Sequence, residues 1–298
     1  MAEKSFVVLP ERGLLTVGGP DRRGFLQGLV SNDIEKVSAA HAIHAALLTA
    51  QGKYLHDFFI AEFPGGFLLD GEAARLPDLQ RRLSLYKLRA KVTVAPAEGG
   101  FEVVAAFGPG ALEALSLPQE PGAAAPFAGG LVFVDPRLAA LGARLILPRE
   151  GASAALRRAG FAEAAFAAYD RTRLELGVPD GSRDLVIEKS ILLESGFDEL
   201  NGVDWQKGCY VGQELTARTK YRGLVKKRLM PVRLAGPAPR PGTPIRRGAE
   251  EVGEIRSGQD GIALALLRLE AVHQPASGEL VADDGTRLTP LKPGWAAF

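Results

Sequence analysis

The chain has 298 residues, of which 46% are hydrophobic and 24% charged, and its formal net charge at pH 7 is +1. This composition is typical of a folded protein with enough chain for two cores, and it excludes a disordered chain. Because no apolar run approaches the length of a bilayer span, we expect no membrane partner. The small net charge gives no overall attraction to nucleic acid, so any electrostatic function must be local.

The single cysteine, Cys209, restricts the redox and metal chemistry of the chain. One cysteine forms no intramolecular disulfide and no Cys-x-x-Cys pair, and it cannot hold an iron-sulfur cluster without ligands from another molecule. We therefore predict no metal site. The N-terminal stretch MAEKSFVVLPERG mixes acids and bases, and it lacks both the apolar core of a signal peptide and the acid-poor character of a transit peptide. These features predict a cytoplasmic protein.

The elements predicted for the N-terminal part follow the order strand, helix, strand, strand, helix, strand. Asp21 is a plausible N-cap for the first helix, and Pro77 suggests a break or a late start in the second. In chain order the six elements are residues 13–19, 20–34, 42–49, 54–63, 71–88 and 89–96. This order is the split β-α-β pattern of ferredoxin-like units.

The same order recurs further along the chain, which indicates a structural duplication without visible sequence repetition. Its elements are a strand at 101–107, a helix at 108–117, strands at 131–135 and 143–148 and a helix at 151–160. The Pro/Gly/Ala stretch 117–130 is predicted to be a loop, and 161–176 to be helical.

Beyond residue 227 short strand candidates are separated by Gly and Pro, which is typical of a small all-β barrel or sandwich. The candidates are 228–236, 242–248, 250–258 and 262–269. We therefore place the domain boundary at residues 227 and 228.

A run of positive charge lies between Lys207 and Arg228, where seven bases stand against one acid, Glu214. If this stretch is helical, Glu214 and Arg218 form a favourable i,i+4 pair. The acids that precede this run could pair with its bases; they are Glu188, Glu194, Asp198, Glu199 and Asp204. Two interpretations stay open, a solvated face with interdomain ion pairs or an anion-binding surface. Only two tyrosines interleave with the bases, which argues against a nucleic-acid partner.

The thiol of Cys209 lies two residues after Lys207 and close to the expected start of a helix. A neighbouring cation and a helix N-terminus both favour the thiolate, so a reactive cysteine is physically plausible. The alternative is a buried cysteine that behaves as a small hydrophobic residue. A nucleophile also needs a base, and the four histidines lie far away in the sequence. The residues alone leave both interpretations open.

Asp57 lies on a predicted strand, on the same face as Leu55 and Phe59. A carboxylate among apolar neighbours is costly unless it is paired or used in chemistry. The alternatives are a strand end exposed to water or a pair with Arg81 or Arg89.

Glu175 lies at the end of a predicted helix, just before the C-cap Gly177. The helix dipole disfavours a carboxylate there, which suggests a local partner or a ligand. An ordinary exposed helix acid is the alternative.

The stretch KGCYVGQE, residues 207–214, resembles the signature of the YgfZ family of folate-binding proteins. This family is related to the T-protein, the aminomethyltransferase of the glycine cleavage system. Four further segments resemble family segments in the same order, so the resemblance covers essentially the whole chain. These segments are GPDRRGFLQGLVSNDI, LLTAQGKYLHDFFI, YKLRAKV and RTRLELGVP.

The resemblance implies an α+β fold, with a duplicated ferredoxin-like folate-binding core in 1–227 and a small C-terminal β-barrel in 228–298. It implies tetrahydrofolate, or a one-carbon derivative of it, as the cofactor. Family members support the assembly or repair of iron-sulfur enzymes, including enzymes that modify tRNA. The expected partners are therefore a reduced folate and iron-sulfur client proteins or assembly factors, and we expect a monomer.

By similarity, the catalytic positions are Cys209 and Asp57. Glu175 corresponds to the glutamate that holds the pterin ring in the T-protein. The remaining folate-binding positions are Lys207, Tyr210, Gly212, Gln213, Glu214 and Arg218. The T-protein has two adjacent acids where this chain has His56 and Asp57, which argues against true aminomethyl transfer.

Three hypotheses follow from the sequence. The first is a folate-binding accessory protein for iron-sulfur proteins. The second is a folate-dependent one-carbon transferase that uses Asp57. The third is an RNA-binding or protein-docking module, and it rests on the basic run alone.

Overall fold

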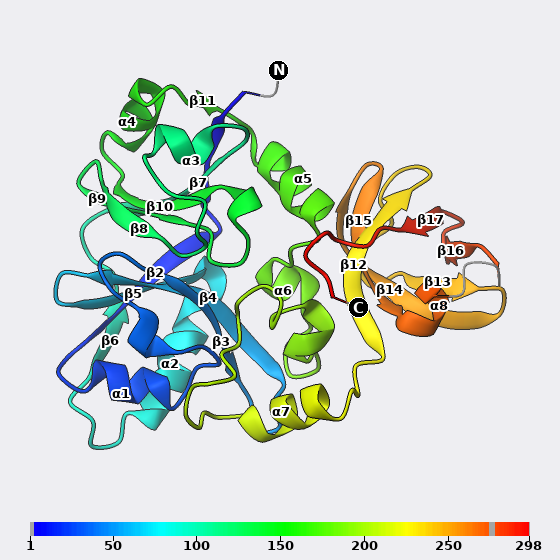
Figure 1. The fold of residues 1–298 in the computed structure, drawn as a ribbon, viewed down its shortest axis with the longest axis horizontal. Helices are drawn as coiled ribbons and strands as arrows, with labels where there is room; N and C mark the ends of the chain where they lie inside the picture. The colour runs from blue at the N-terminus through cyan, green and yellow to red at the C-terminus, as the bar shows by residue number, and fades with distance from the viewer. Residues whose placement is uncertain (1–2, 274–277, 298) are drawn as a thin grey trace. The chain divides into compact units, whose positions relative to one another are not determined.

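The computed structural model describes residues 3–273 and 278–297, and the chain divides into two compact units (Figure 1). Unit 1 consists of Met1–Leu48, His56–Tyr169 and Asn201–Val211. Unit 2 consists of Thr49–Leu55, Asp170–Leu200 and Gly212–Phe298. The domains 1–227 and 228–298 remain a prediction, because compact units in space do not test which segments fold on their own.

The first sheet of unit 1 has five strands in the order β3-β4-β5-β2-β6. Its elements in chain order are β2 (Arg12–Gly18), α1 (Arg22–Gln27), the 3-10 helix η1 (Ile34–Lys36), β3 (Ile43–Leu48), β4 (Tyr54–Phe63), β5 (Gly66–Glu72), the 3-10 helix η2 (Ala73–Arg75), α2 (Leu76–Tyr86) and β6 (Thr93–Pro96). The pairs β4–β5, β5–β2 and β2–β6 are antiparallel. The strands β4, β5, β2 and β6 have the ferredoxin-like order, but the prediction had β3 and β4 as the two middle strands. In the structure β5 takes one of these places between β4 and β2, and β3 lies at the edge.

Strand β5 was not predicted, because the helical prediction for 71–88 began inside it. The strand contains Gly66 and Gly71, and glycine is more typical of turns than of strands, so the buried residues between them were not recognised as a strand. The expected late start of the following helix is confirmed. Pro77 lies in the first turn of α2, where its missing N–H and fixed φ are tolerated.

The second sheet of unit 1 has six strands in the order β11-β1-β7-β10-β9-β8. Its elements are β1 (Ser5–Val8), β7 (Phe101–Phe107), α3 (Ala111–Ala114), β8 (Ala124–Phe127), β9 (Gly130–Val134), the 3-10 helix η3 (Ala139–Leu141), β10 (Ala143–Pro148), α4 (Ala152–Arg158) and β11 (Ala162–Glu163). Strands β7, β10, β9 and β8 repeat the arrangement of β2, β5, β4 and β3. The N-terminal strand β1 takes the place that β6 has in the first sheet. The predicted duplication is therefore confirmed, with one strand supplied from outside the repeat.

The predicted loop 117–130 contains the strand β8, which pairs antiparallel with β9. Its composition of Ala, Pro and Phe concealed it. Because β8 lies at the edge of the sheet, Pro126 is tolerated there. The predicted helix 161–176 is also shorter than expected, since β11 precedes the helix α5 (Phe166–Leu176).

The two sheets of unit 1 share an apolar cluster that includes Phe59 and Leu68 from the first sheet and Phe133 and Ile146 from the second. Buried ion pairs lie beside this cluster. Asp70 of β5 accepts hydrogen bonds from the guanidinium groups of two arginines on other strands, Arg12 and Arg144. These fully paired charges fix the two sheets against each other.

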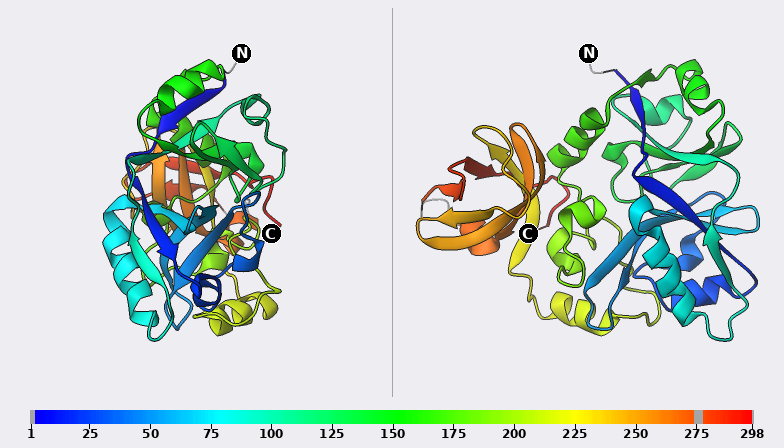
Figure 2. Two further views of the ribbon diagram at one scale, coloured as in Figure 1. Left: turned by 90° about the vertical axis from the view of Figure 1, so that its left-hand side faces the viewer. Right: turned by 180° about the vertical axis from the view of Figure 1, so that it is seen from behind.

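Unit 2 contains most of α5, the helices α6 (Gly181–Asp184) and α7 (Gln213–Tyr221), the 3-10 helix η4 (Leu192–Ser195) and a closed barrel (Figures 1 and 2). The barrel order is β12-β15-β14-β13-β16-β17. Its strands are β12 (Lys227–Leu234), β13 (Pro244–Arg247), β14 (Glu250–Gln259), β15 (Ile262–Arg268), β16 (Leu280–Ala282) and β17 (Arg287–Pro290), with the helix α8 (Leu269–His273) after β15. A barrel rather than a sandwich is therefore observed, and its last two strands were not predicted.

A second buried charge network lies in unit 2. Arg173 of α5 is only 1% exposed, and its guanidinium donates to Asp170 Oδ1 at 2.7 Å and to Asp184 Oδ2 at 2.9 Å. It also donates to Ser257 Oγ on β14 at 2.6 Å. The arginine thus joins α5, α6 and the barrel.

Within residues 3–273 and 278–297, no helix is long and apolar enough to cross a membrane.

Candidate functional site

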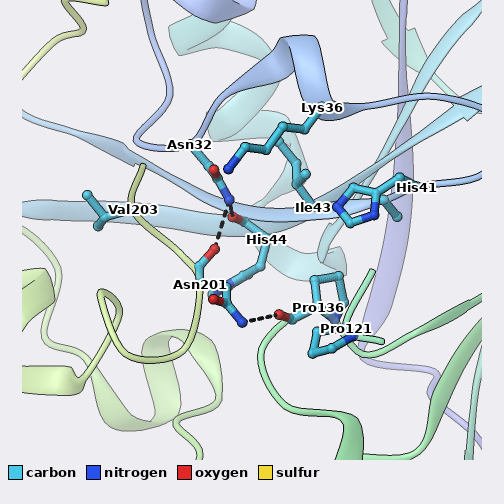
Figure 3. Close-up of a pocket in the computed structure, with 10 residues that line it drawn as sticks. Asn32, Lys36, His41, Ile43, His44, Pro121, Pro136, Asn201 and Val203 are labelled. Atoms are coloured by element: carbon cyan, nitrogen blue, oxygen red, sulfur yellow. Dashed lines mark hydrogen bonds between the residues drawn. The ribbon is translucent and has the colours of Figure 1, made fainter. Parts of the chain in front are cut away.

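A cavity of about 320 Å³ opens in unit 1 beside the edge strand β3 (Figure 3). Its wall is formed by the residues around η1, the start of β3, two prolines from the second sheet's loops and the segment that begins at residue 201. The lining residues are Asn32, Lys36, His41, Ala42, Ile43, His44, Pro121, Pro136, Asn201 and Val203. Its size lies at the lower end of the range for small-molecule pockets, about 300–1,000 Å³.

Two asparagines hold the cavity wall together (Figure 3). Asn32 Nδ2 donates to the backbone oxygens of His44 and Asn201, each at 2.8 Å. Asn201 Nδ2 donates to the backbone oxygen of Pro136 at 3.1 Å. Asn201 has a φ of +56°, a conformation that asparagine tolerates better than most residues. These bonds fix three separate chain segments, so the cavity is preformed.

Behind the wall, His44 Nε2 lies 3.0 Å from Asp57 Oδ2. Both side chains are buried, with exposed fractions of 1% and 5%. Burial lowers the pKa of His44, although the hydrogen bond to Asp57 and its charge oppose that shift. The imidazole is therefore neutral near pH 7, and in the tautomer with its proton on Nε2 it donates to Asp57 Oδ2. This hydrogen bond fixes the orientation of the Asp57 carboxylate, which is shielded from water behind the cavity wall.

The alternatives considered for Asp57 are wrong. The carboxylate is neither exposed at a strand end nor paired with Arg81, which binds Asp78 at 2.5 Å instead. Its partner His44 lies on the neighbouring strand of the sheet. The predicted alternation along β4 is confirmed, since Asp57 and Phe59 both contact His44. The neighbouring His56 points to the other face, where its Nε2 lies 2.9 Å from Asp78 Oδ2.

His56 gives a prediction for stability. Burial, reinforced by the charge of Arg75, lowers the pKa of His56 to about 4, against the opposing effect of Asp78. The unfolded chain has a pKa near 6.5, so it takes up a proton between pH 6.5 and 4 that the folded protein refuses. The free energy of unfolding therefore falls as the pH falls through this window, by roughly 1.4 kcal/mol per pH unit from this group.

Urea unfolding of the wild type and of His56→Gln at several pH values isolates this contribution. The difference in unfolding free energy between the two proteins should be steady above pH 6.5 and change steadily below it. An unchanged difference from pH 7 to 4.5 would contradict the assignment.

The signature segment places its predicted residues in both units. In unit 1, Cys209 is exposed, whereas Lys207 and Tyr210 are buried on either side of it. In unit 2, Gly212 has a φ of +84° and precedes α7. Helix α7 carries Gln213 and confirms the predicted i,i+4 pair.

That pair joins Arg218 to Glu214 at 2.6 Å, and both side chains are exposed. Further internal pairing within the basic run is also found. Arg228 donates to Glu199 and to the backbone oxygen of Leu193. Part of the positive charge is thus neutralised inside unit 2.

Glu175 lies near the end of α5, where Arg171 Nε is 3.1 Å from its carboxylate and half of each side chain is exposed. Gly177, with a φ of +74°, ends the helix as predicted. The structure thus places Glu175 as an exposed helix acid with a local partner. Its contact with a pterin stays a prediction.

Of the predicted site residues, Asp57 is associated with the cavity through His44, and Cys209 follows the segment whose residues Asn201 and Val203 line it. The cavity residues themselves were missed. Asn32 and Asn201 are 169 positions apart, and no local pattern joins them. A histidine at position 44, inside the buried run of β3, was the one available signal.

In the part of the chain that the structure describes, no group of three or more His, Cys, Asp or Glu side chains is arranged to hold a metal ion.

Comparison with known proteins places the chain in a family. Residues 226–298 match the family described as CAF17, C-terminal beta-barrel domain. The human iron-sulfur cluster assembly factor IBA57, mitochondrial, is 38% identical over 286 residues, which cover 90% of this chain and 78% of the human protein. This chain belongs to the IBA57 family. The mouse IBA57 protein is 33% identical and spans 96% of this chain and 84% of its own length.

The IBA57 family assignment agrees with the fold. The aminomethyltransferase T of the glycine cleavage system from Bartonella henselae superposes with a TM-score of 0.78 at 15% identity, covering 99% of this chain and 86% of that one. The α+β fold class is thereby confirmed, and the fold is the one that the T-protein has.

Two predictions need correction. The named relatives are IBA57 proteins, so the YgfZ resemblance holds only at the coarser level of the T-protein-like fold. The prediction of a cytoplasmic protein is contradicted, because the IBA57 relatives of human and mouse are named as mitochondrial. An N-terminal composition argument was too weak to decide the compartment.

Proposed function

We propose that this protein supports the assembly of iron-sulfur proteins, as a reduced-folate-binding accessory protein that works with partner proteins. The observation that carries the proposal is similarity over 90% of the chain to a relative named as an iron-sulfur cluster assembly factor. The role predicted from the sequence agrees with that name. That the clients include enzymes that modify tRNA is carried over into the proposal as an expectation from the sequence.

The chemistry of the chain supports an accessory role. Cys209 is its one cysteine, and an iron-sulfur cluster needs several ligands. The remaining ligands must therefore come from a partner, an assembly factor or a client. The exposed position of Cys209 suits a thiol that acts on another molecule.

The cavity of unit 1 fits the pterin end of a reduced folate. A pterin is a flat ring with hydrogen-bond donors and acceptors along its edge. The wall offers amide and imidazole groups, and Pro121, Pro136 and Val203 supply apolar surface for the ring faces. A cavity of about 320 Å³ holds the ring system, while the glutamate tail extends beyond it. On the same wall, Lys36 is partly exposed but pairs with Asp204 at 2.6 Å, and burial lowers the pKa of His41, so the anionic tail would have to compete with Asp204 for Lys36.

A binding experiment tests the folate proposal. Asn201→Gly keeps the positive φ accessible but removes the amide that ties the wall to Pro136, so the cavity is less preformed and tetrahydrofolate binding should weaken by about tenfold. Isothermal titration calorimetry measures the change. Gln119→Ala removes an exposed amide outside the cavity and should bind as the wild type does. If the wild type does not bind tetrahydrofolate, the proposal that the protein binds a reduced folate is wrong. If Asn201→Gly binds tetrahydrofolate as tightly as the wild type does, the cavity beside β3 is not the folate site.

A second candidate function is folate-dependent one-carbon transfer, and the buried Asp57–His44 pair favours it. Here Asp57 would act as the acid or base next to the bound folate. The test is formation of methylenetetrahydrofolate from a methylamine donor, lost in Asp57→Ala. The residue His56 counts against the T-protein reaction, because the T-protein has an acid at that position and here a histidine paired with Asp78 takes its place.

A further inference from the structure

The segment Asn201–Val211 of unit 1 is bound along its length to the loop that follows α1. Ser31, Asn32 and Gly28 supply most of the contacts from that loop. The bonds are Ser31 Oγ to Gly202 O at 2.6 Å, Asn32 Nδ2 to Asn201 O at 2.8 Å, Asp204 N to Ser31 O at 3.0 Å and Val211 N to Gly28 O at 3.2 Å. The segment is thus a fixed strap across the loop, and Gly208 and Cys209 are among its exposed residues.

Lys207 is the central contact of this strap. Its Nζ donates to three backbone oxygens, those of Gln27 at 2.9 Å, Val30 at 2.5 Å and Asn32 at 2.8 Å. An ammonium group has three N–H donors, so all of them are used within the protein. The side chain is only 7% exposed. Lys207 is therefore engaged by the backbone of unit 1 rather than presented to a ligand.

Burial disfavours the charge of Lys207, and the acidic groups around it favour that charge. Asp33 and Asp204 face it, and Asp204 in turn pairs with Lys36 at 2.6 Å. The Tyr210 ring lies with its centroid 5.0 Å from Nζ. Burial lowers the pKa of Lys207 to about 8, and the two aspartates oppose that shift, so the ammonium form still prevails at neutral pH.

Burial alternates along the signature in a way that displays the thiol. Lys207 and Tyr210 are each 7% exposed, while Gly208 and Cys209 between them are exposed. A Cβ added to Gly208 would meet no atom within 4 Å, so the tip of the strap is open. Two buried anchors thus flank an outward-facing pair of residues.

We propose that Lys207 is a positioning residue that clamps the strap onto the carbonyl oxygens after α1 and so holds Cys209 out for a partner. This inference rests on the proposed function for the use of the thiol. It also changes the role predicted for Lys207, from a folate ligand to an internal clamp. A methionine at this position fills the same volume but leaves three buried carbonyl oxygens without their donor.

Hydrogen exchange of the full chain tests the clamp directly. In Lys207→Met, the backbone amides of residues 204, 207 and 211 should exchange at least about tenfold faster than in the wild type, because the strap opens locally. The amides of the central strand β5 should keep their protection. Lys207→Arg retains the charge and several donors and should restore part of the protection. Lys91→Met, an exposed lysine of the same unit, should exchange as the wild type does.

Iron-sulfur enzyme activity in cells lacking the endogenous protein gives the second readout. Cells with Lys207→Met should have iron-sulfur enzyme activity as low as cells with Cys209→Ser. Cells with Lys207→Arg should have an intermediate activity, and cells with Gly208→Ala should have the wild-type activity. Unchanged exchange in Lys207→Met would overturn the clamp. So would a loss of protection throughout unit 1 in both Lys207 variants, because it would indicate a general stabilising role. If Cys209→Ser loses activity and Lys207→Met does not, the positioning role fails while the proposed function stands. If Cys209→Ser stays active, the use of the thiol fails first.

Discussion

Cys209→Ser should abolish support of iron-sulfur enzymes while changing the free energy of unfolding by less than about 0.5 kcal/mol. The thiol is exposed, so replacing sulfur by oxygen removes little packing. Serine is a poor nucleophile and a poor ligand for iron, so the chemistry is lost. The measurement is iron-sulfur enzyme activity in cells that lack the endogenous protein, combined with urea unfolding of the purified variant.

Gly208→Ala is the matched control, since it changes the adjacent exposed residue without touching the thiol. It should retain both stability and cellular activity. Full activity of Cys209→Ser would show that the sulfur is dispensable, and the proposed role of this residue would be wrong.

Arg173→Met should lower the free energy of unfolding by about 3–5 kcal/mol, because it leaves the buried carboxylate of Asp184 without its cation. Asp170 keeps Arg183, but Asp184 loses the arginine that binds its Oδ2. The bond from Arg173 to Ser257 is lost as well, which loosens α5 from β14. Urea unfolding, followed by the exchange of β14 amides, measures the effect.

Arg171→Met on the same helix provides the comparison. Arg171 pairs with Glu175 where both side chains are half exposed, so its loss should cost less than about 1 kcal/mol. If Arg173→Met and Arg171→Met lower the free energy of unfolding by similar amounts, the buried network stabilises the protein no more than an exposed ion pair does. Arg173→Lys should fall between them, because lysine keeps the charge but not the planar fork of donors.

The sequence was informative where a single segment determines its own structure. The alternation of β4 placed Asp57 and His56 on opposite faces, and the Glu214–Arg218 spacing predicted a helical ion pair. Gly177 ended α5 as expected. Each of these depends on residues within a few positions of one another, where the period of the element decides the outcome.

Features built from distant segments escaped prediction. The partner of Asp57 is a histidine on another strand, and the cavity depends on asparagines from different parts of the chain. Strand β8 has a loop-like composition and is specified by its pairing with β9. Lys207 lies within a recognised signature, yet its role as a clamp depends on carbonyl oxygens 175 to 180 positions earlier.

During synthesis, the strand β1 emerges long before β7, the strand with which it pairs. Its residues Ser5–Val8 pair with Val104–Phe107, so about a hundred residues are synthesised between the two halves of the ladder. The first sheet has all its strands once residue 96 has emerged, but the second must recruit the oldest part of the chain. Until β7 has emerged, β1 lacks its ladder partner and presents an unpaired edge that can pair with another chain. The N-terminal strand therefore stays without its partner from the start of synthesis until residue 107 has emerged, and misassembly of the nascent chain through this edge is possible throughout that interval.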